Sequence, residues 1–232
     1  MKNQLIKTRT IKFQTSARPV GVLTLALAAA LMLASPLFAG KTPPGHSSSY
    51  GMNLAAWQDL YWRWTYGNVI IPPDSNGNAI AGDGVVLMPL PNAPGDGTPG
   101  SIDVTLNSGQ PFLLPLWALL GTSYSDGTPP DPMVDVSVFK TLDITFKIDG
   151  VTVVNTANVM SYYTGFSFAP AVPLDFPPVN AIIWFEGIGL THAPLTPGTH
   201  TMTLDAKNTE PVFGGSIFEY HNTWNLTVQA AE

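Results

Sequence analysis

The chain has 232 residues, of which 45% are hydrophobic and only 11% charged, and it contains no cysteine. This composition argues against an intrinsically disordered chain and excludes disulfides, and the length suits a single domain. Five of the ten basic residues and none of the 16 acidic residues precede residue 40, so the remainder has a formal charge of −11. Such an acidic surface repels phosphate groups, which disfavours nucleic acid and anionic lipid as partners and leaves neutral ligands, divalent cations and cationic surfaces open.

The N-terminal segment has the pattern of an export signal. Residues 1–18 are basic without any acid, residues 20–33 form an apolar run, and the small residue Ala39 precedes Gly40. This order predicts a signal peptide over residues 1–39 and a secreted or periplasmic protein. The apolar run is shorter than the ~20 residues of a membrane-spanning helix, so we expect no membrane attachment after cleavage. An uncleaved membrane anchor is the alternative.

One helix is predicted after the signal. Residues 40–52 are small and polar and predict a flexible lead-in to a single domain over residues 53–230. A helix over residues 53–66 is predicted by the helical spacing of Leu54, Trp57, Tyr61 and Trp64. Asp59 and Arg63 lie one turn apart and are placed to pair. Gly67 and the two prolines at 72 and 73 end the pattern.

The rest of the domain has the period of β-strands. Apolar and polar residues alternate over residues 102–107 and 142–149, and again towards the C-terminus over residues 200–204 and 218–228. Asp149 and Gly150 stand between two β-rich runs and predict a hairpin with a type I′ turn. Because no helical pattern separates the strands, we expect an antiparallel β-sandwich, either immunoglobulin-like or jelly-roll-like.

The order of motifs carries a resemblance. The Trp-rich helix is followed by GVVLMPLP, IDVTLNSGQPFLLPLW, KIDGVTVVN, PLTPGTHTMTLDA and WNLTV. This series resembles an uncharacterised family of exported bacterial β-sandwich proteins that have a Trp-rich N-terminal helix and a PLxPGTHT strand. The resemblance covers most of the chain after residue 40 but implies no activity and no site residue. Many members carry a cysteine pair, which this chain lacks.

The aromatic helix allows two interpretations. Aromatic rings that are exposed and coplanar can form a platform for sugars, whereas one stripe of rings at helical spacing is typical of a core. Trp57, Tyr61 and Trp64 share such a stripe, which favours an anchor that covers one end or face of the sandwich. Trp62 lies off the stripe, and we expect it to be partly exposed with Tyr66. Together with Arg63, these two residues are the predicted ligand-binding set, for a neutral glycan or a protein partner.

Candidate metal ligands are few. The segment DSNGNAIAGDG offers Asp74, Asn76, Asn78 and Asp83 as oxygen ligands for calcium, although no glutamate closes the loop as in an EF-hand. A plain turn is the preferred interpretation. Transition-metal ligands would come from His192, His200, His221, Glu186 and Glu219. Of these, His200 shares its side of a strand with apolar residues and is expected to be a core histidine, whereas Glu219 and His221 share an outward face. No other cofactor is indicated.

Two functional classes follow from the sequence. The common signatures of serine, zinc and cysteine hydrolases are absent, which favours a non-enzymatic module for binding or surface assembly. The alternative is a small secreted hydrolase of polysaccharides. It would use Glu186, the one acid in an apolar strand, with Asp175 or Asp205 as the second carboxylate. The preferred interpretation of Glu186 is a buried partner for Arg63 or for backbone amides.

Overall fold

The predicted helix and strands appear in the structure, a computed structural model that describes residues 49–212 and 215–230. All of these residues belong to one compact unit, Gly40–Glu232. The predicted signal peptide over residues 1–39 and most of the predicted lead-in lie outside the described residues. No helix in the described part of the chain is long and apolar enough to cross a membrane.

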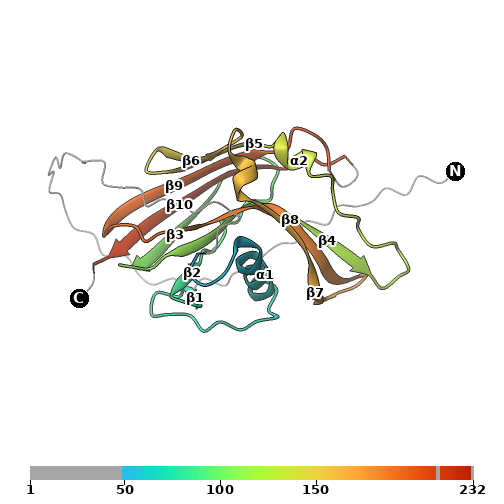
Figure 1. Cartoon of the computed structure of the whole chain (residues 1–232), viewed down its shortest axis with the longest axis horizontal. Coiled ribbons are helices and arrows are strands. Elements are labelled where there is room, and N and C mark those ends of the chain that lie inside the picture. The colour runs from blue at the N-terminus through green and yellow to red at the C-terminus, as the bar shows by residue number, and fades with distance from the viewer. Residues whose placement is uncertain (1–48, 213–214, 231–232) are drawn as a thin grey trace. The chain divides into compact units, whose positions relative to one another are not determined.

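The described strands form two five-stranded sheets that pack as a sandwich (Figure 1). The first sheet has the order β1-β2-β4-β8-β7 and the second has the order β3-β10-β9-β5-β6. The first sheet comprises β1 (Ala79–Ala81), β2 (Val85–Leu87), β4 (Phe112–Tyr124), β7 (Tyr163–Phe176) and β8 (Val179–His192). The second comprises β3 (Gly100–Asn107), β5 (Asp143–Ile148), β6 (Val151–Asn155), β9 (Gly198–Lys207) and β10 (Glu219–Gln229). The prediction of a mainly β sandwich is confirmed.

Each sheet is mixed rather than purely antiparallel, which corrects one detail of the prediction. β3 pairs parallel to β10, and β2 pairs parallel to β4. Parallel neighbours need a long crossover, which a loop can supply as well as a helix. Here the chain leaves β2, passes through the segment 88–99 to β3 in the other sheet, and returns as β4. The lack of a helical pattern between strands therefore did not exclude parallel pairs.

The main core lies between the two sheets. The second sheet contributes Phe146, Met202 and Trp224, and the first sheet contributes Leu114 and Ile188. All five side chains are almost fully buried. Burial of an apolar side chain of this size stabilises the fold by about 1.5–3 kcal/mol, so the sandwich can be stable without disulfides.

A third layer is formed by α1 (Leu54–Thr65), which covers the outer face of the first sheet (Figure 1). The Asn53 side chain accepts a hydrogen bond from the Ala56 amide (2.9 Å) and caps the helix start. Trp57 and Tyr61 are buried, and the Tyr61 hydroxyl donates to the carbonyl oxygen of Met88 (2.9 Å). Trp64, the third ring of the stripe, is half-buried, so the anchor interpretation agrees with the observed burial most fully at Trp57 and Tyr61.

Two short helices occupy the connections. α2 (Ser137–Lys140) precedes β5, and the 3₁₀ helix η1 (Val159–Tyr162) links β6 of the second sheet to β7 of the first. The predicted hairpin joins β5 to β6, which pair antiparallel. Asp149 has φ 51° and Gly150 has φ 78°, the two positive φ angles that a type I′ turn requires. The hairpin prediction is confirmed.

Candidate functional site

The outward face of the second sheet is polar and regular. On β3, β10 and β9 every second side chain points away from the core, because successive residues of a strand face opposite sides. The strand register places these side chains in rows across the sheet. Neighbouring strands lie about 4.8 Å apart and successive rows about 6.7 Å apart. The first two rows are Thr105–Thr227–Thr199 and Asp103–Asn225–Thr201.

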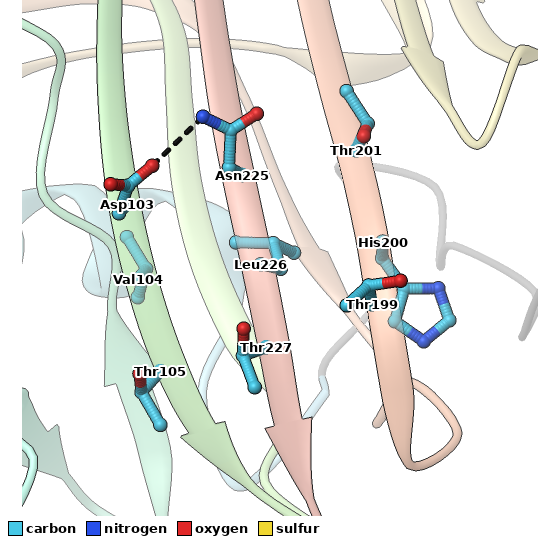
Figure 2. A pocket seen from close by; sticks show the side chains of 9 residues that line it. All are labelled: Asp103, Val104, Thr105, Thr199, His200, Thr201, Asn225, Leu226 and Thr227. Atoms are coloured by element: carbon cyan, nitrogen blue, oxygen red, sulfur yellow. Dashed lines mark hydrogen bonds between the residues drawn. The ribbon is translucent and has the colours of Figure 1, made fainter. Parts of the chain in front are cut away.

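These two rows line a shallow open groove of about 410 Å³ (Figure 2). The Asn225 amide nitrogen donates to one carboxylate oxygen of Asp103 (2.8 Å), which fixes both side chains across the two strands. The second Asp103 oxygen and the Asn225 amide oxygen have no hydrogen-bond partner within the described residues. The groove therefore offers two neighbouring acceptors beside a set of threonine hydroxyls, which can both donate and accept.

His200 stands between the groove residues Thr199 and Thr201 on β9 (Figure 2), and strand alternation turns its side chain to the opposite face. Its Nδ1 is 2.6 Å from the Asp149 carboxylate, and its Nε2 is 2.8 Å from the carbonyl oxygen of Thr196. As expected, this histidine has hydrogen-bond partners and lies on the side of β9 that Met202 and Leu204 share, where its side chain is 12% exposed. The ring connects the β5–β6 turn to β9 and so rigidifies one side of the groove.

The opposite end of the same face is charged. His221 Nδ1 is 2.7 Å from Asp205 and its Nε2 is 3.1 Å from Glu219, while the Lys207 ammonium is 2.8 Å from Glu219. The hydrogen bond to Asp205, and after it the one to Glu219, raises the pKa of His221. Hydrogen bonds from Lys207 and then His221 lower the pKa of Glu219. Because the two ring nitrogens point to different carboxylates, these groups do not converge on one metal position.

The predicted calcium loop is closed by its own hydrogen bonds. Asp74 accepts from the backbone amides of Asn76 and Asn78 (both 2.9 Å), so its carboxylate organises a turn. Desolvation alone would raise the pKa of Asp74, but the amides of Asn78 and Asn76 together lower it. The Asn78 side chain donates to the Thr105 carbonyl oxygen (2.6 Å), and the Asn76 side chain donates to the side-chain oxygen of Asn107 (3.1 Å).

Within the described residues, Asp83 makes no hydrogen bond to this loop, and the loop supplies no cluster of free oxygens. Within residues 49–212 and 215–230, no group of three histidine, aspartate or glutamate residues is placed to hold a metal ion.

Glu186 is buried, with 3% of its surface exposed. One carboxylate oxygen accepts from the Val134 backbone amide (2.9 Å) and the other from the Tyr163 hydroxyl (2.8 Å). Burial, and then this contact with Glu186, raises the pKa of Tyr163. The expected backbone-amide partner is present, whereas the other expected partner, Arg63, lies elsewhere. The carboxylate ties the segment before α2 to β8.

The other two candidate acids lie far from Glu186. The β7–β8 register pairs Gly165 with Glu186 and Phe176 with Val179, which places Asp175 roughly 20 Å away along the strands. Asp205 is exposed on the outer face of the second sheet. Glycosidases need two carboxyl groups about 5–9.5 Å apart. The structure does not bring these three acids together.

Trp62 is buried rather than exposed, which corrects the expectation for the aromatic helix. Only 6% of its surface is accessible, because the ring packs against Phe185 (5.9 Å between centroids) and Tyr66 (6.2 Å). Burial raises the pKa of Tyr66 to about 12. Spacing alone failed here because the apolar cluster between α1 and the first sheet includes Trp62 as well as Trp57 and Tyr61.

Arg63 is also engaged within the fold. It pairs with Asp59 (2.8 Å), as predicted, and donates to the Pro170 carbonyl oxygen (2.8 Å). Its guanidinium also lies over the Phe168 ring, 5.4 Å from the centroid. The three predicted ligand-binding residues Trp62, Arg63 and Tyr66 therefore hold α1 against the first sheet.

The groove residues were not among the predicted site residues. A signal was present, because THTMT and WNLTV carry threonine or asparagine at every second position, with His200 and otherwise apolar residues between. The strand order, which brings residues 103, 199 and 225 together, is not visible in the sequence. Comparisons with protein-family models, curated proteins and solved structures found no match to this chain.

Proposed function

We propose that this protein is an exported, non-enzymatic binding module that holds a neutral, hydroxyl-rich glycan on the β3–β10–β9 face. The observation that carries the proposal is the Asp103–Asn225 pair, which leaves two adjacent acceptors free within the groove. Two such acceptors match a pair of neighbouring sugar hydroxyls. The threonines on both sides supply further donors and acceptors at fixed positions, since β-branched side chains are stiff.

The charge of the protein supports a neutral ligand. The chain after residue 40 has a formal charge of −11, which repels sulfated, phosphorylated and carboxylated polymers. Among the described residues, no phenylalanine, tyrosine or tryptophan lines the groove, so hydrogen bonds rather than ring stacking provide the contacts. Hydrogen bonds exposed to water contribute little individually. We therefore expect one groove to bind one short glycan with modest affinity. A polymer, which offers many copies of the same unit, should retain the protein more strongly.

A hydrolase centred on Glu186 receives less support. Both carboxylate oxygens of Glu186 are engaged, and Asp175 and Asp205 lie outside the distance that glycoside hydrolysis requires. The proposal therefore predicts retention of a polysaccharide without release of reducing ends.

Binding is tested with the purified exported protein on neutral insoluble and soluble polysaccharides, with a carboxylated polymer for comparison. Asn225→Ala and Asp103→Ala should reduce retention several-fold, and Thr227→Val should reduce it without a change of side-chain shape. Thr152→Val is the matched control, because Thr152 lies on the same sheet but outside the groove. Equal retention of wild type and Asn225→Ala would refute the groove as the binding surface.

Export is tested separately. The proposal expects protein recovered outside the cytoplasm to begin at Gly40, as mass spectrometry of the intact protein would show. An exported protein that keeps Met1 at its N-terminus would contradict the cleaved signal.

A further inference from the structure

The free edge of β6 is occupied by a side chain. Among the described strands β6 pairs with β5 alone, so one side of its backbone faces away from the sheet. On that side the Val153 carbonyl oxygen accepts from the Asn158 amide nitrogen (3.1 Å), and the Asn155 amide donates to the Asn158 amide oxygen (2.7 Å). Because the Asn155 amide has a single hydrogen, this bond excludes a bond to β5. One carboxamide thus makes the two bonds that a residue of a neighbouring strand would make.

The opposite edge of the second sheet is closed in the same way. β3 pairs only with β10. On its free side the Thr105 carbonyl oxygen accepts from the Asn78 side chain (2.6 Å), and the Asn107 amide donates to the Gln110 side-chain oxygen (2.7 Å). As on β6, the occupied groups are a carbonyl and the amide two residues later. On β3 these two bonds come from two different carboxamides, those of Asn78 and Gln110.

These edges need such closure. Unpaired edge strands present a row of donors and acceptors that can pair with another chain, and proteins block them with prolines, charges or short strands. β6 has the sequence VTVVN, without proline or charge, and Val151 is 57% exposed. The first sheet has other protection, since β1 has three residues and β7 carries Pro170 and Pro173.

We infer that Asn158, Asn78 and Gln110 guard the two free edges of the second sheet against pairing with a second copy of this chain. The primary amide is the one side-chain group that offers a donor and an acceptor in the same arrangement as a peptide bond. It can therefore occupy one carbonyl and one amide of the edge and interrupt the row of groups that another strand would pair with. This role is independent of glycan binding, because the guards lie at the sheet edges and not in the groove.

The first test removes a guard on each edge. Asn158→Ala and Gln110→Ala should remain folded by circular dichroism and should double in mass as concentration rises, as measured by light scattering after size exclusion. Asn68→Ala is the control, because this asparagine is exposed and its side chain makes no hydrogen bond within the described residues. Adding Val151→Lys to Asn158→Ala should return the protein to the mass of one chain, since a charged edge resists pairing.

A second test uses the unaltered protein and does not depend on the variants folding. The Asn155 and Asn107 amides should exchange their hydrogens roughly ten times more slowly than unbonded edge amides, because each is hydrogen-bonded. Rapid exchange at both amides overturns the inference. The same holds if both folded alanine variants keep the mass of one chain at every concentration, or if the wild type itself dimerises in a way that Val151→Lys abolishes.

Discussion

Gln58 is fully buried between α1 and the first sheet, yet neither atom of its carboxamide has a hydrogen-bond partner among the described residues. Its nitrogen lies directly over Gly189 of β8, where an added Cβ would be 1.9 Å from it. A buried amide without a partner costs about 1–3 kcal/mol. Gln58→Met replaces the amide with an unbranched apolar side chain of similar size and should remove this cost.

The expected gain is measurable. A gain of about 1–3 kcal/mol corresponds to a rise in melting temperature of roughly 2–12 °C for a domain of this size. Gln58→Glu is the opposite change, because it places an unpaired charge in the same site and should lower stability. Both variants can be compared with the wild type by calorimetry and by urea denaturation, where the slope should stay constant and only the midpoint should move.

A double-mutant cycle tests the contact with Gly189. Gly189→Ala should destabilise the wild type, since its Cβ would collide with the Gln58 amide. The same substitution should cost much less in Gln58→Ala, where the colliding atoms are gone. If Gln58→Met melts below the wild type, the amide is satisfied after all, and our reasoning about this site is wrong.

Three further predictions concern stability. Trp57→Ala and Trp62→Ala should each cost about 3–5 kcal/mol in urea denaturation, because both rings are buried. Gly150→Val should lower the melting temperature by several degrees, since a β-branched residue resists φ 78°, whereas Asn92→Ala in an exposed loop should not. Burial lowers the pKa of His192, so the folded state disfavours its charged form. Stability should therefore be complete above about pH 6.5 and decline as the pH falls, by up to about 1.4 kcal/mol per pH unit, and His192→Gln should flatten this decline.

Each of these has a contradicting result. If Trp62→Ala unfolds in urea with the same free energy as the wild type, the burial of this ring does not contribute to stability. Equal melting temperatures for Gly150→Val and Asn92→Ala would count against the turn geometry. An unchanged acid profile in His192→Gln would assign the acid sensitivity to carboxylates instead.

The hairpin and the helix could be predicted from the sequence because their signals are local. The turn at Asp149 and Gly150 depends on backbone angles that few residues tolerate, and α1 depends on a spacing within twelve residues. The pairing of Asp59 with Arg63 is local for the same reason. Such features do not require knowledge of which strands become neighbours.

The candidate site and the edges could not be predicted, since they depend on strand order. Asp103 and Asn225 are 122 residues apart and meet only because β3 lies parallel beside β10. The role of Asn78 could not be predicted for the same reason. Its side chain binds the backbone of Thr105, which lies 27 residues later on β3. The predicted exposure of Trp62 was wrong because the spacing of residues on one helix does not show how far the facing sheet extends beneath it.

The positions of the helix and of the groove follow from one difference between the sheets. β4 and β8 are buried along long continuous runs, so both faces of the first sheet need cover, and α1 supplies it on the outer side. β9 alternates between buried and exposed residues, so the second sheet needs cover on one face only. Within the described residues its outer face is therefore left uncovered, and this is the face that we propose for binding. Substitutions beneath α1 should then change the melting temperature, whereas substitutions on the outer face should change binding and leave the melting temperature unaltered.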